Sequence, residues 1–410
     1  ASLFATATGR EQASPDRLRP FGRSQLDQLT SRSIPMKTMK ADVVVIGGGV
    51  IGAAVAYGLV EQKASVVMLD REDFQLTASR GNFGLVWLQG KGYGMPRYAQ
   101  WSQEATELWS NFAEKLEDQT GIPQYYHRTG GFQICVGEEE YSKRSTFLEE
   151  MRAQSLTGTY DCEMISRDEL QSMIPKLPLG PMVSGASFCP HDGFANPLHL
   201  LRALHQAFTQ LKGQFFPSAD VQTIEFNTDG FLIQTNTTKF STRKLVIASG
   251  LATTKLSALV GIKVPVRPQR GQVLVTEKTD QLFPFATGRI RQNADGSFMF
   301  GASHEEVGYD LSTTNSVLQD IANHALAVFP TLKNLQLIRS WGSLRVLTPD
   351  QKPVYVESQR CPGAFAVTSH SGVSLASIHS NYLVDWILSG QTQPMFEVFD
   401  SARFDVPVTP

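Results

Sequence analysis

The sequence has little of what marks several large classes of protein. It contains four cysteines in 410 residues and no CxxC pair, which argues against a disulfide framework or a zinc site and favours buried thiols in a reducing compartment. Lysine and arginine (37) nearly balance aspartate and glutamate (39), so no basic field is available for nucleic acid or a membrane surface. No run approaches the roughly 20 apolar residues of a membrane span. We therefore expect a soluble, cytoplasmic protein without a metal site.

The chain is long enough for about two domains, and its hydrophobic content of 41% suffices for a large core. The first part differs from the rest, because it carries Ser, Thr, Arg, Gln and Pro without periodicity and ends just before an apolar strand. We predict that residues 1–39 are a disordered leader or extension, either an expression leader or a targeting peptide.

Residues 41–73, ADVVVIGGGVIGAAVAYGLVEQKASVVMLDRED, predict a strand, a turn, a helix and a second strand. Gly47 permits a tight turn, Gly49 leaves room for a pyrophosphate, and Gly52 lets the helix pack close to the sheet. Asp70 follows about 20 residues later, where a carboxylate binds a ribose hydroxyl. Free N–H groups at the helix start favour phosphate. The stretch predicts a dinucleotide site, with an ordinary glycine-rich turn as the alternative.

The order of the remaining segments predicts how the domains are arranged. A region with antiparallel strand composition follows the nucleotide unit, and a strand, a glycine turn and a helix close the chain. This order predicts a discontinuous nucleotide domain in residues 40–90, 191–260 and 340–400, with a substrate domain of residues 91–190 and 261–339 inserted into it. A nicotinamide dehydrogenase fits less well, because such enzymes normally complete their fold contiguously.

Several stretches together resemble the D-amino-acid oxidase superfamily of FAD-dependent oxidoreductases, which includes glycine oxidase, sarcosine oxidase and the β subunits of opine, proline and hydroxyproline dehydrogenases. They are VVVIGGGVIG with the following Asp-Arg pair, ASRGNFG, DGFANP, VQTI, VIASG, PQRGQ, DGSFMFGAS, WGSLRVLTPDQKPV and HSGVSLA, and they span nearly everything from Lys40 to about Gly390. The resemblance implies an α/β fold, in which an FAD-binding Rossmann-like domain carries an inserted α+β substrate domain built on an antiparallel sheet.

The resemblance also implies a set of FAD-binding residues. Val221 would meet the adenine through its backbone, and residues 371–373 would approach the carbonyl edge of the flavin, where N–H donors stabilise negative charge. For Ser79 and Asn82, a capped turn without a ligand is the alternative. The full set is Gly47, Gly49, Val50, Ile51, Gly52, Asp70, Arg71, Ser79, Arg80, Asn82, Gly84, Val221, Ala248, Gly250, Ser371, Gly372, Val373 and Ser374.

The chain departs from one branch of this family at two places. Monomeric sarcosine oxidases attach flavin through a cysteine just before a Pro-Asp pair, where this chain reads RVLT at residues 345–348. Non-covalent FAD is therefore implied. The lysine that sarcosine oxidases use to activate oxygen falls near Met299, which leaves the choice between oxidase and dehydrogenase open.

The candidate catalytic residues are Arg345 and His370. In the glycine oxidase branch, an arginine in the stretch WGSLRVLTPD binds the substrate carboxylate, a task that suits guanidinium geometry; an ion pair with Asp350 or another carboxylate is the alternative. His370 precedes the turn expected at the flavin edge, and His191 is a weaker candidate; either could instead be structural. The aromatic residues that either fold over the pocket or pack a helix are Tyr93, Tyr98 and Trp101.

The resemblance implies oxidation of the C–N bond of an amino acid or secondary amine to an imine, with hydride transfer to flavin N5 and subsequent hydrolysis. Glycine, sarcosine, D-amino acids, proline analogues and opines all remain open as substrates. The alternative is a flavin-binding subunit of a multi-subunit amine or opine dehydrogenase, which needs partner electron-transfer subunits for activity. Assembly as a homo-oligomer is a further option.

Overall fold

The computed structural model describes residues 38–71, 77–392 and 394–405. The first 37 residues of the predicted leader lie outside the described residues, and the last two belong to a strand: Thr38 pairs with Lys239 and Met39 with Phe240. Among the helices in the described part of the chain, none is both long and apolar enough to cross a membrane.

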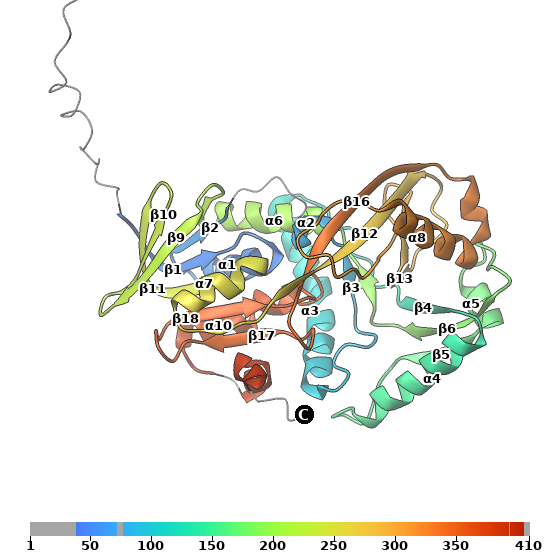
Figure 1. The fold of residues 1–410 in the computed structure, drawn as a ribbon, viewed down its shortest axis with the longest axis horizontal. Helices are drawn as coiled ribbons and strands as arrows, with labels where there is room; N and C mark the ends of the chain where they lie inside the picture. Colours follow the sequence, from blue (N-terminus) through green and yellow to red (C-terminus); the bar gives the residue numbers. More distant parts are fainter. Residues whose placement is uncertain (1–37, 72–76, 393, 406–410) are drawn as a thin grey trace, which may run out of the picture. The chain divides into compact units, whose positions relative to one another are not determined.

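The first of two large sheets has eight strands and a parallel centre (Figure 1). The order β18-β11-β1-β2-β8 is parallel, while β17 and the β9–β10 hairpin add antiparallel strands. Residues 43–46 of the central strand are fully covered, as expected for a β-branched run in a parallel sheet. The strands are β1 (Thr38–Ile46), β2 (Val66–Leu69), β8 (Gln214–Phe216), β9 (Val221–Asn227), β10 (Gly230–Thr235), β11 (Lys239–Ile247), β17 (Val354–Glu357) and β18 (Ala364–Thr368).

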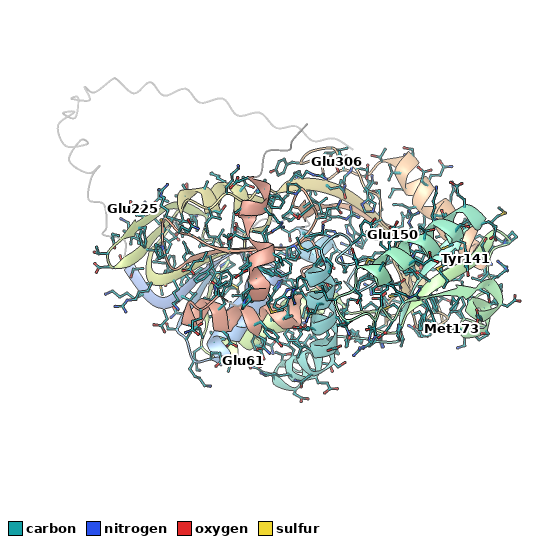
Figure 2. All side chains as sticks on the ribbon, turned by 90° about the horizontal axis from the view of Figure 1, so that it is seen from below. Glu61, Tyr141, Glu150, Met173, Glu225 and Glu306 are labelled. Carbon is teal, nitrogen blue, oxygen red and sulfur yellow. The ribbon has the colours of Figure 1, made fainter. Side chains whose placement is uncertain are left out.

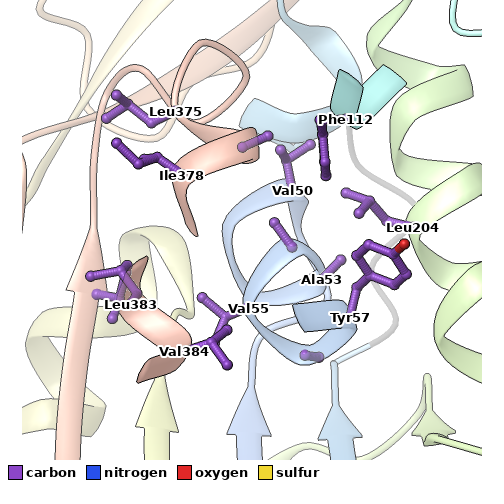
Figure 3. Packing of buried hydrophobic residues seen from close by; sticks show 14 of the residues in the cluster. Val50, Ala53, Val55, Tyr57, Phe112, Leu204, Leu375, Ile378, Leu383 and Val384 are labelled. Carbon is purple, nitrogen blue, oxygen red and sulfur yellow. The ribbon is translucent and has the colours of Figure 1, made fainter. Parts of the chain in front are cut away.

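Helices pack on one face of this sheet around α1, which is buried on nearly all sides. Figure 3 shows Ala53 and Tyr57 of α1 facing Leu204 of α6, and Val55 beside Val384 of α10. The short η1 (Gly250–Ala252), α7 (Thr253–Leu259) and the β9–β10 hairpin pack with a second cluster on the opposite face. The helices of the first face are α1 (Val50–Glu61), α3 (Pro96–Thr120), α6 (Pro197–Gln210), α9 (Ala376–His379) and α10 (Tyr382–Ser389).

Polar contacts tie α3 to α1. Lys115 of α3 lies 2.7 Å from Glu61, which is labelled in Figure 2 at the end of α1. Proline at the start of α3 and Gly121 in a left-handed conformation at its end delimit this helix.

The second large sheet runs in the order β16-β12-β15-β14-β13-β4-β6-β5 and is antiparallel except where β13 and β4 pair in parallel. Helices α4, α5 and α8 pack with it (Figure 1). Its strands are β4 (Gly131–Val136), β5 (Glu163–Ser166), β6 (Val183–Cys189), β12 (Arg267–Lys278), β13 (Ala286–Thr287), β14 (Ile290–Gln292), β15 (Ser297–Phe300) and β16 (Leu337–Leu347). The remaining elements are α2 (Ala78–Gly81), β3 (Leu85–Val86), α4 (Glu138–Ala153), α5 (Arg167–Met173), β7 (Gly193–Phe194), α8 (Asn315–Val328), η2 (Pro330–Asn334), η3 (Pro394–Phe399) and η4 (Ser401–Phe404).

The predicted α/β class is confirmed, whereas the inserted domain and its boundaries stay a prediction. Two elements make contacts across those boundaries. Helix α3, expected in the substrate domain, packs against α6 and α9 of the first face. Strand β16, whose residues from 340 onward were expected in the nucleotide domain, pairs with β12 of the second sheet.

Candidate functional site

A cavity of about 790 Å³ lies where the two sheets approach each other. Residues that follow the carboxyl ends of β1, β2, β11 and β18 line one side, and residues of β4, β12 and β16 line the other. In doubly wound α/β folds, the carboxyl edge of the parallel strands is where cofactors bind. The cavity is therefore placed for a nucleotide cofactor.

The glycine turn between β1 and α1 shapes the first wall of the cavity. Gly47 has a φ of +114°, and a Cβ there would lie 2.3 Å from the Ala248 carbonyl oxygen. A Cβ on Gly52 would lie 1.9 Å from the Gly47 carbonyl oxygen, so the helix packs directly on the turn. Gly49 lines the cavity, and a Cβ there would meet the Ser79 hydroxyl at 2.8 Å. The turn is as compact as the sequence predicted.

Hydrogen bonds fix this turn from two sides. The Gly48 N–H donates to the Asp70 carboxylate (2.8 Å), and the Val50 N–H at the start of α1 donates to Ser79 Oγ (2.9 Å). His205 of α6 lies 2.7 Å from the Gly48 carbonyl oxygen, and burial lowers the pKa of its imidazole. A neutral His205 donates its Nε2–H to that carbonyl. His205 was not predicted, because one histidine on an amphipathic helix carries no signal of a site.

The segment between α2 and β3 forms a capped turn. The Asn82 amide donates to the carbonyls of Ala78 (3.1 Å) and Ser79 (3.0 Å), and its oxygen accepts from the Gly84 N–H (2.8 Å). This is the capping that the sequence left open as an alternative. Ser79, Asn82 and Gly84 also line the cavity, so the capped turn forms part of its wall.

All the predicted FAD-binding residues line the cavity except Gly52 and Ser371. Gly52 lies beneath the glycine turn. Ser371 is buried next to the cavity, where its Oγ accepts from Lys91 Nζ (2.6 Å) and Tyr98 Oη (2.9 Å). Lys91 itself lines the cavity and was not predicted, although the glycine-rich stretch GKGYG around it is a turn signal in the sequence.

The wall fits FAD. The glycine turn brings a helix start to the cavity with no side chain of its own, and Asp70 and Ser79, which hold its Gly48 and Val50 N–H groups, line the same wall. All four cysteines are in the described part of the chain, are buried and do not line the cavity, which agrees with non-covalent binding.

Basic and imidazole side chains gather at the other end of the cavity, which we call the substrate end and define by Lys91, Arg289, His304, Arg345 and His370. Arg345 Nη1 donates to the carbonyls of residues 270 (3.2 Å) and 303 (2.8 Å). In the described part of the chain, no carboxylate forms an ion pair with Arg345.

The alternative role for Arg345 was an ion pair with Asp350 or another carboxylate. Asp350 is wrong as the partner, and among the other described carboxylates Glu305 acts on the charge of Arg345 without forming an ion pair with it. Asp350 binds Arg403 instead, with Nε at 2.9 Å from the carboxylate. Arg403 holds Asp350 where the chain turns between β16 and β17, so the Arg345 guanidinium is left to the cavity.

His370 lines the substrate end as a neutral group. Part of its surface is open to the cavity, yet burial of the ring, followed by the charges of Lys91 and Arg345, lowers its pKa to about 3. A histidine with that pKa is a weak base near neutral pH. The predicted catalytic role of His370 stays a prediction.

The other candidates lie away from the cavity. His191 bridges Asp161 and Arg128, at 2.7 Å from each. The Met299 side chain is buried in the second sheet. Of the three aromatic candidates, Tyr98 and Trp101 are buried in the packing of α3 and Tyr93 is exposed, and none lines the cavity.

Comparisons with known proteins agree with this geometry. The sequence model of the family described as FAD dependent oxidoreductase (DAO) matches residues 42–386. One of the subunits of opine oxidase from Rhizobium meliloti is 35% identical over 366 residues, covering 89% of this chain and 98% of that protein. Glycine oxidase of Geobacillus kaustophilus (strain HTA426) is 23% identical over 379 residues, covering 90% and 97%.

Solved structures show the same fold. The crystal structure of glycine oxidase from Geobacillus kaustophilus matches with a TM-score of 0.79 at 23% identity, covering 90% of this chain and 98% of that one. The crystal structure of L-proline dehydrogenase from P. horikoshii matches with a TM-score of 0.78 at 19% identity, covering 90% and 99%. The predictions of FAD as cofactor and of an enzyme that oxidises amino acids or amines are confirmed. The chain therefore belongs to the DAO family of FAD-dependent oxidoreductases.

Proposed function

We propose that this protein oxidises the C–N bond of an amino acid with a free or substituted amine, and that Arg345 binds the substrate carboxylate. The observation that supports this most strongly is the Arg345 guanidinium itself, which lines the cavity without an ion-pair partner among the described residues. A guanidinium matches a carboxylate in geometry, and a charge-assisted hydrogen bond of this kind contributes about 1.5–3 kcal/mol.

In this proposal the chain's own residues bind and orient the two reactants. The glycine turn and the start of α1 hold the pyrophosphate, Asp70 holds the adenosine ribose, and residues 371–374 lie against the flavin. When bound, FAD supplies the acceptor for the hydride that leaves the substrate carbon. Apolar wall residues, Trp87 and Val273 among them, exclude water and favour the uncharged amine.

The proposed reaction needs no nucleophilic side chain of the protein. The substrate C–H bond gives up its electron pair as hydride, the nitrogen lone pair forms the C=N bond, and the nitrogen loses a proton where it carried one. Water adds to the resulting imine, and the C–N bond breaks to give a carbonyl compound and an amine. His370, neutral and open to the cavity, can accept a hydrogen bond from the substrate amine.

A second candidate function is that of the flavin-binding subunit of a larger amine or opine dehydrogenase. It is favoured by the similarity to the opine oxidase subunit of Rhizobium meliloti, which extends over 98% of that protein. In this case, electrons pass from the reduced cofactor to a partner chain.

One experiment distinguishes the two candidate functions. The purified protein is incubated with glycine, sarcosine, proline, D-amino acids and N-(carboxyalkyl) amino acids together with an artificial electron-acceptor dye. We expect one substrate class to reduce the dye and to form a carbonyl product in equal amount. A protein that holds FAD but reduces no dye with any of them would contradict independent catalysis and support the subunit function.

A further inference from the structure

The substrate end holds more positive charge than one carboxylate requires. Lys91 and Arg289 line it in addition to Arg345. Among the described residues that line the cavity, the carboxylates are those of Asp70 and Asp220. Asp70 accepts from the glycine turn, and its carbonyl oxygen accepts from the N–H of the residue that precedes Asp220 (2.9 Å), so both acids belong to the nucleotide end. The acid that acts on this end is Glu305, whose charge reaches Arg345, but Glu305 pairs with Arg270 and does not line the cavity. Lys91 has no such acid beside it among the described residues.

The turn that carries Lys91 has a fixed shape. Gly90 and Gly92 flank the lysine with φ angles of +78° and +80°, which side chains rarely adopt, and a Cβ on Gly92 would lie 2.2 Å from the Ala99 nitrogen. The Gly90 N–H donates to Tyr160 Oη (2.9 Å). The turn is thus pressed against the start of α3 and tied to the chain beyond α4.

Helix α4 and the residue that follows it hold the same turn from the other side. The Gln154 amide donates to the Gly92 carbonyl (2.9 Å) and accepts from the Gly94 N–H (2.8 Å). Tyr93 Oη donates to Glu150 at 2.9 Å; Glu150 is labelled in Figure 2. With the turn held in this way, the half-buried Lys91 side chain reaches Ser371.

The Lys91 ammonium has one hydrogen-bond acceptor among the described residues. Its Nζ donates to Ser371 Oγ (2.6 Å), a neutral acceptor that also receives a hydrogen bond from Tyr98. Within the ranges that the structure describes, Lys91 forms no ion pair with a carboxylate. An ammonium has three donors, so two remain for a ligand in the cavity.

Lys91 and Arg345 also act on one part of the cavity. Both charges reach the imidazole of His370, which stays neutral near physiological pH and so cannot balance them. A ligand that fills this space meets two separate cations near one neutral ring. An anion with two carboxylates gives each cation a charged partner. An amino acid with one carboxylate, bound at Arg345, leaves the partly buried Lys91 ammonium without one.

We propose that Lys91 binds a second substrate carboxylate, so that the site selects N-(carboxyalkyl) amino acids, secondary amines with a carboxylate on each side of the nitrogen. This inference rests on the proposed function, because it assigns the first carboxylate to Arg345. Lys91 then sets specificity by its charge and contributes less to the oxidation of substrates that have one carboxylate.

Two thioethers test the inference on the FAD-loaded protein without turnover. Thiodiacetate and (methylthio)acetate share the CH₂–S–CH₂ or CH₃–S–CH₂ frame, differ by one carboxylate, and have no C–N bond to oxidise. By titration calorimetry we expect thiodiacetate to bind at least about tenfold more tightly. Lys91→Met should reduce this ratio to about one and leave the affinity for (methylthio)acetate within about threefold.

Further variants separate charge from structure. Lys91→Arg keeps the charge and should keep the preference, whereas Lys91→Gln keeps a donor near Ser371 without charge and should lose it. Lys143→Met is the matched control, because Lys143 is exposed and pairs with Glu139 outside the cavity. A wild-type ratio near one, a preference that survives Lys91→Gln, or no binding of either thioether would each overturn the inference.

The outcome is independent of the test of the proposed function. If amino acids with one carboxylate reduce the dye but the thioether ratio is near one, the proposed function stands and the role of Lys91 fails. If thiodiacetate is preferred but no amine reduces the dye, the carboxylate site stands and catalysis by this chain alone fails. If Lys91→Met shifts the reduction potential of the bound flavin and weakens both thioethers equally, Lys91 serves the cofactor and the inference is overturned.

Discussion

The two ends of the cavity are built from different chemical groups. At the nucleotide end, backbone N–H groups of the glycine turn and the start of α1 face the cavity, and the side chains of Asp70, Ser79 and His205 hold that backbone in place. At the substrate end, long side chains reach the cavity from segments far apart in the sequence, among them Lys91 and Arg345.

The difference shows which part of such a site can change. A backbone turn depends on the absence of side chains, so nearly any substitution of Gly47 or Gly52 removes it. A wall of separate cations can gain or lose one charge without loss of the fold. In the proposed function, the nucleotide end thus binds the cofactor, and the substrate end sets which amine is oxidised.

The largest expected effect comes from breaking the nucleotide end. Gly49→Val would place a branched side chain on the cavity wall, against the Ser79 hydroxyl that caps α1. We expect the purified variant to hold at least about tenfold less FAD, because the phosphates lose their approach to the backbone. The flavin-to-protein ratio in the absorbance spectrum measures this. Thr146→Val, at an exposed position of α4 outside the cavity, is the control. A yellow Gly49→Val protein would contradict the assigned phosphate site.

The next effect tests the substrate end through Arg345→Met. We expect kcat/KM for the best amino-acid substrate to fall about 100-fold, because about 3 kcal/mol of charge-assisted bonding is lost. For the corresponding primary amide, which has no carboxylate charge, the change should stay below about threefold. Arg339→Met on the exposed part of the same strand is the control. Equal losses on acid and amide would mean that Arg345 supports the structure and not the carboxylate.

A smaller effect concerns the segment that closes the substrate end. Arg270 is buried and lies 2.6 Å from Glu305 and 2.5 Å from Asp310, near the segment of residues 302–311 that contributes to the cavity wall. Arg270→Met should lower the free energy of unfolding by about 2 kcal/mol, since the partly buried Glu305 loses its charged partner, whereas the exposed Asp310 contributes little. Chemical denaturation measures this loss.

The control for that variant is the neighbouring exposed pair. Arg267 lies 2.5 Å from Glu306, which is labelled in Figure 2, and both side chains are largely in solvent. Arg267→Met should cost less than about 1 kcal/mol. Similar losses in the two variants would show that the Arg270 network contributes no more than a surface ion pair.

The smallest expected effect is a change of folding stability with pH. Burial lowers the pKa of His379 of α9, whose Nε2 lies 2.9 Å from Tyr355 Oη, to about 3 from 6.5, so the unfolded chain takes up a proton first as pH falls. Its contribution to stability is complete above pH 6.5 and is lost as pH falls from 6.5 toward 3. Between about pH 7 and 5, we expect wild type to lose about 2 kcal/mol more than His379→Gln does. Melting at these two pH values measures the difference, and equal slopes would contradict it.

Much of the nucleotide end could be predicted because its signals are local in the chain. Gly47, Gly49 and Gly52 stand within one turn, and Asp70 ends the next strand. The same locality identified Ser79 and Asn82, although the sequence could not separate a ligand contact from a turn cap. In the structure Ser79 caps the start of α1, Asn82 caps its own turn, and both line the cavity.

The substrate end was predictable in part. Arg345 was reached through a family resemblance, but the partner of Asp350 depended on Arg403, more than fifty residues away, and no local pattern links them. Lys91 was missed because its place at the site depends on contact with Ser371, 280 positions later. Tertiary packing determines such contacts, and neither composition nor periodicity predicts them.

The most direct test of the central claim is the visible spectrum of the purified protein during anaerobic addition of iminodiacetate, an N-(carboxyalkyl) amino acid, followed by admission of air. We expect a flavin spectrum that bleaches on addition of the amine, because cofactor and substrate share one cavity; recovery in air identifies an oxidase, and persistence of the bleached state identifies a dehydrogenase. A colourless protein, or a yellow one that neither iminodiacetate nor any amine of the substrate panel bleaches, would contradict the claim that this cavity oxidises amines.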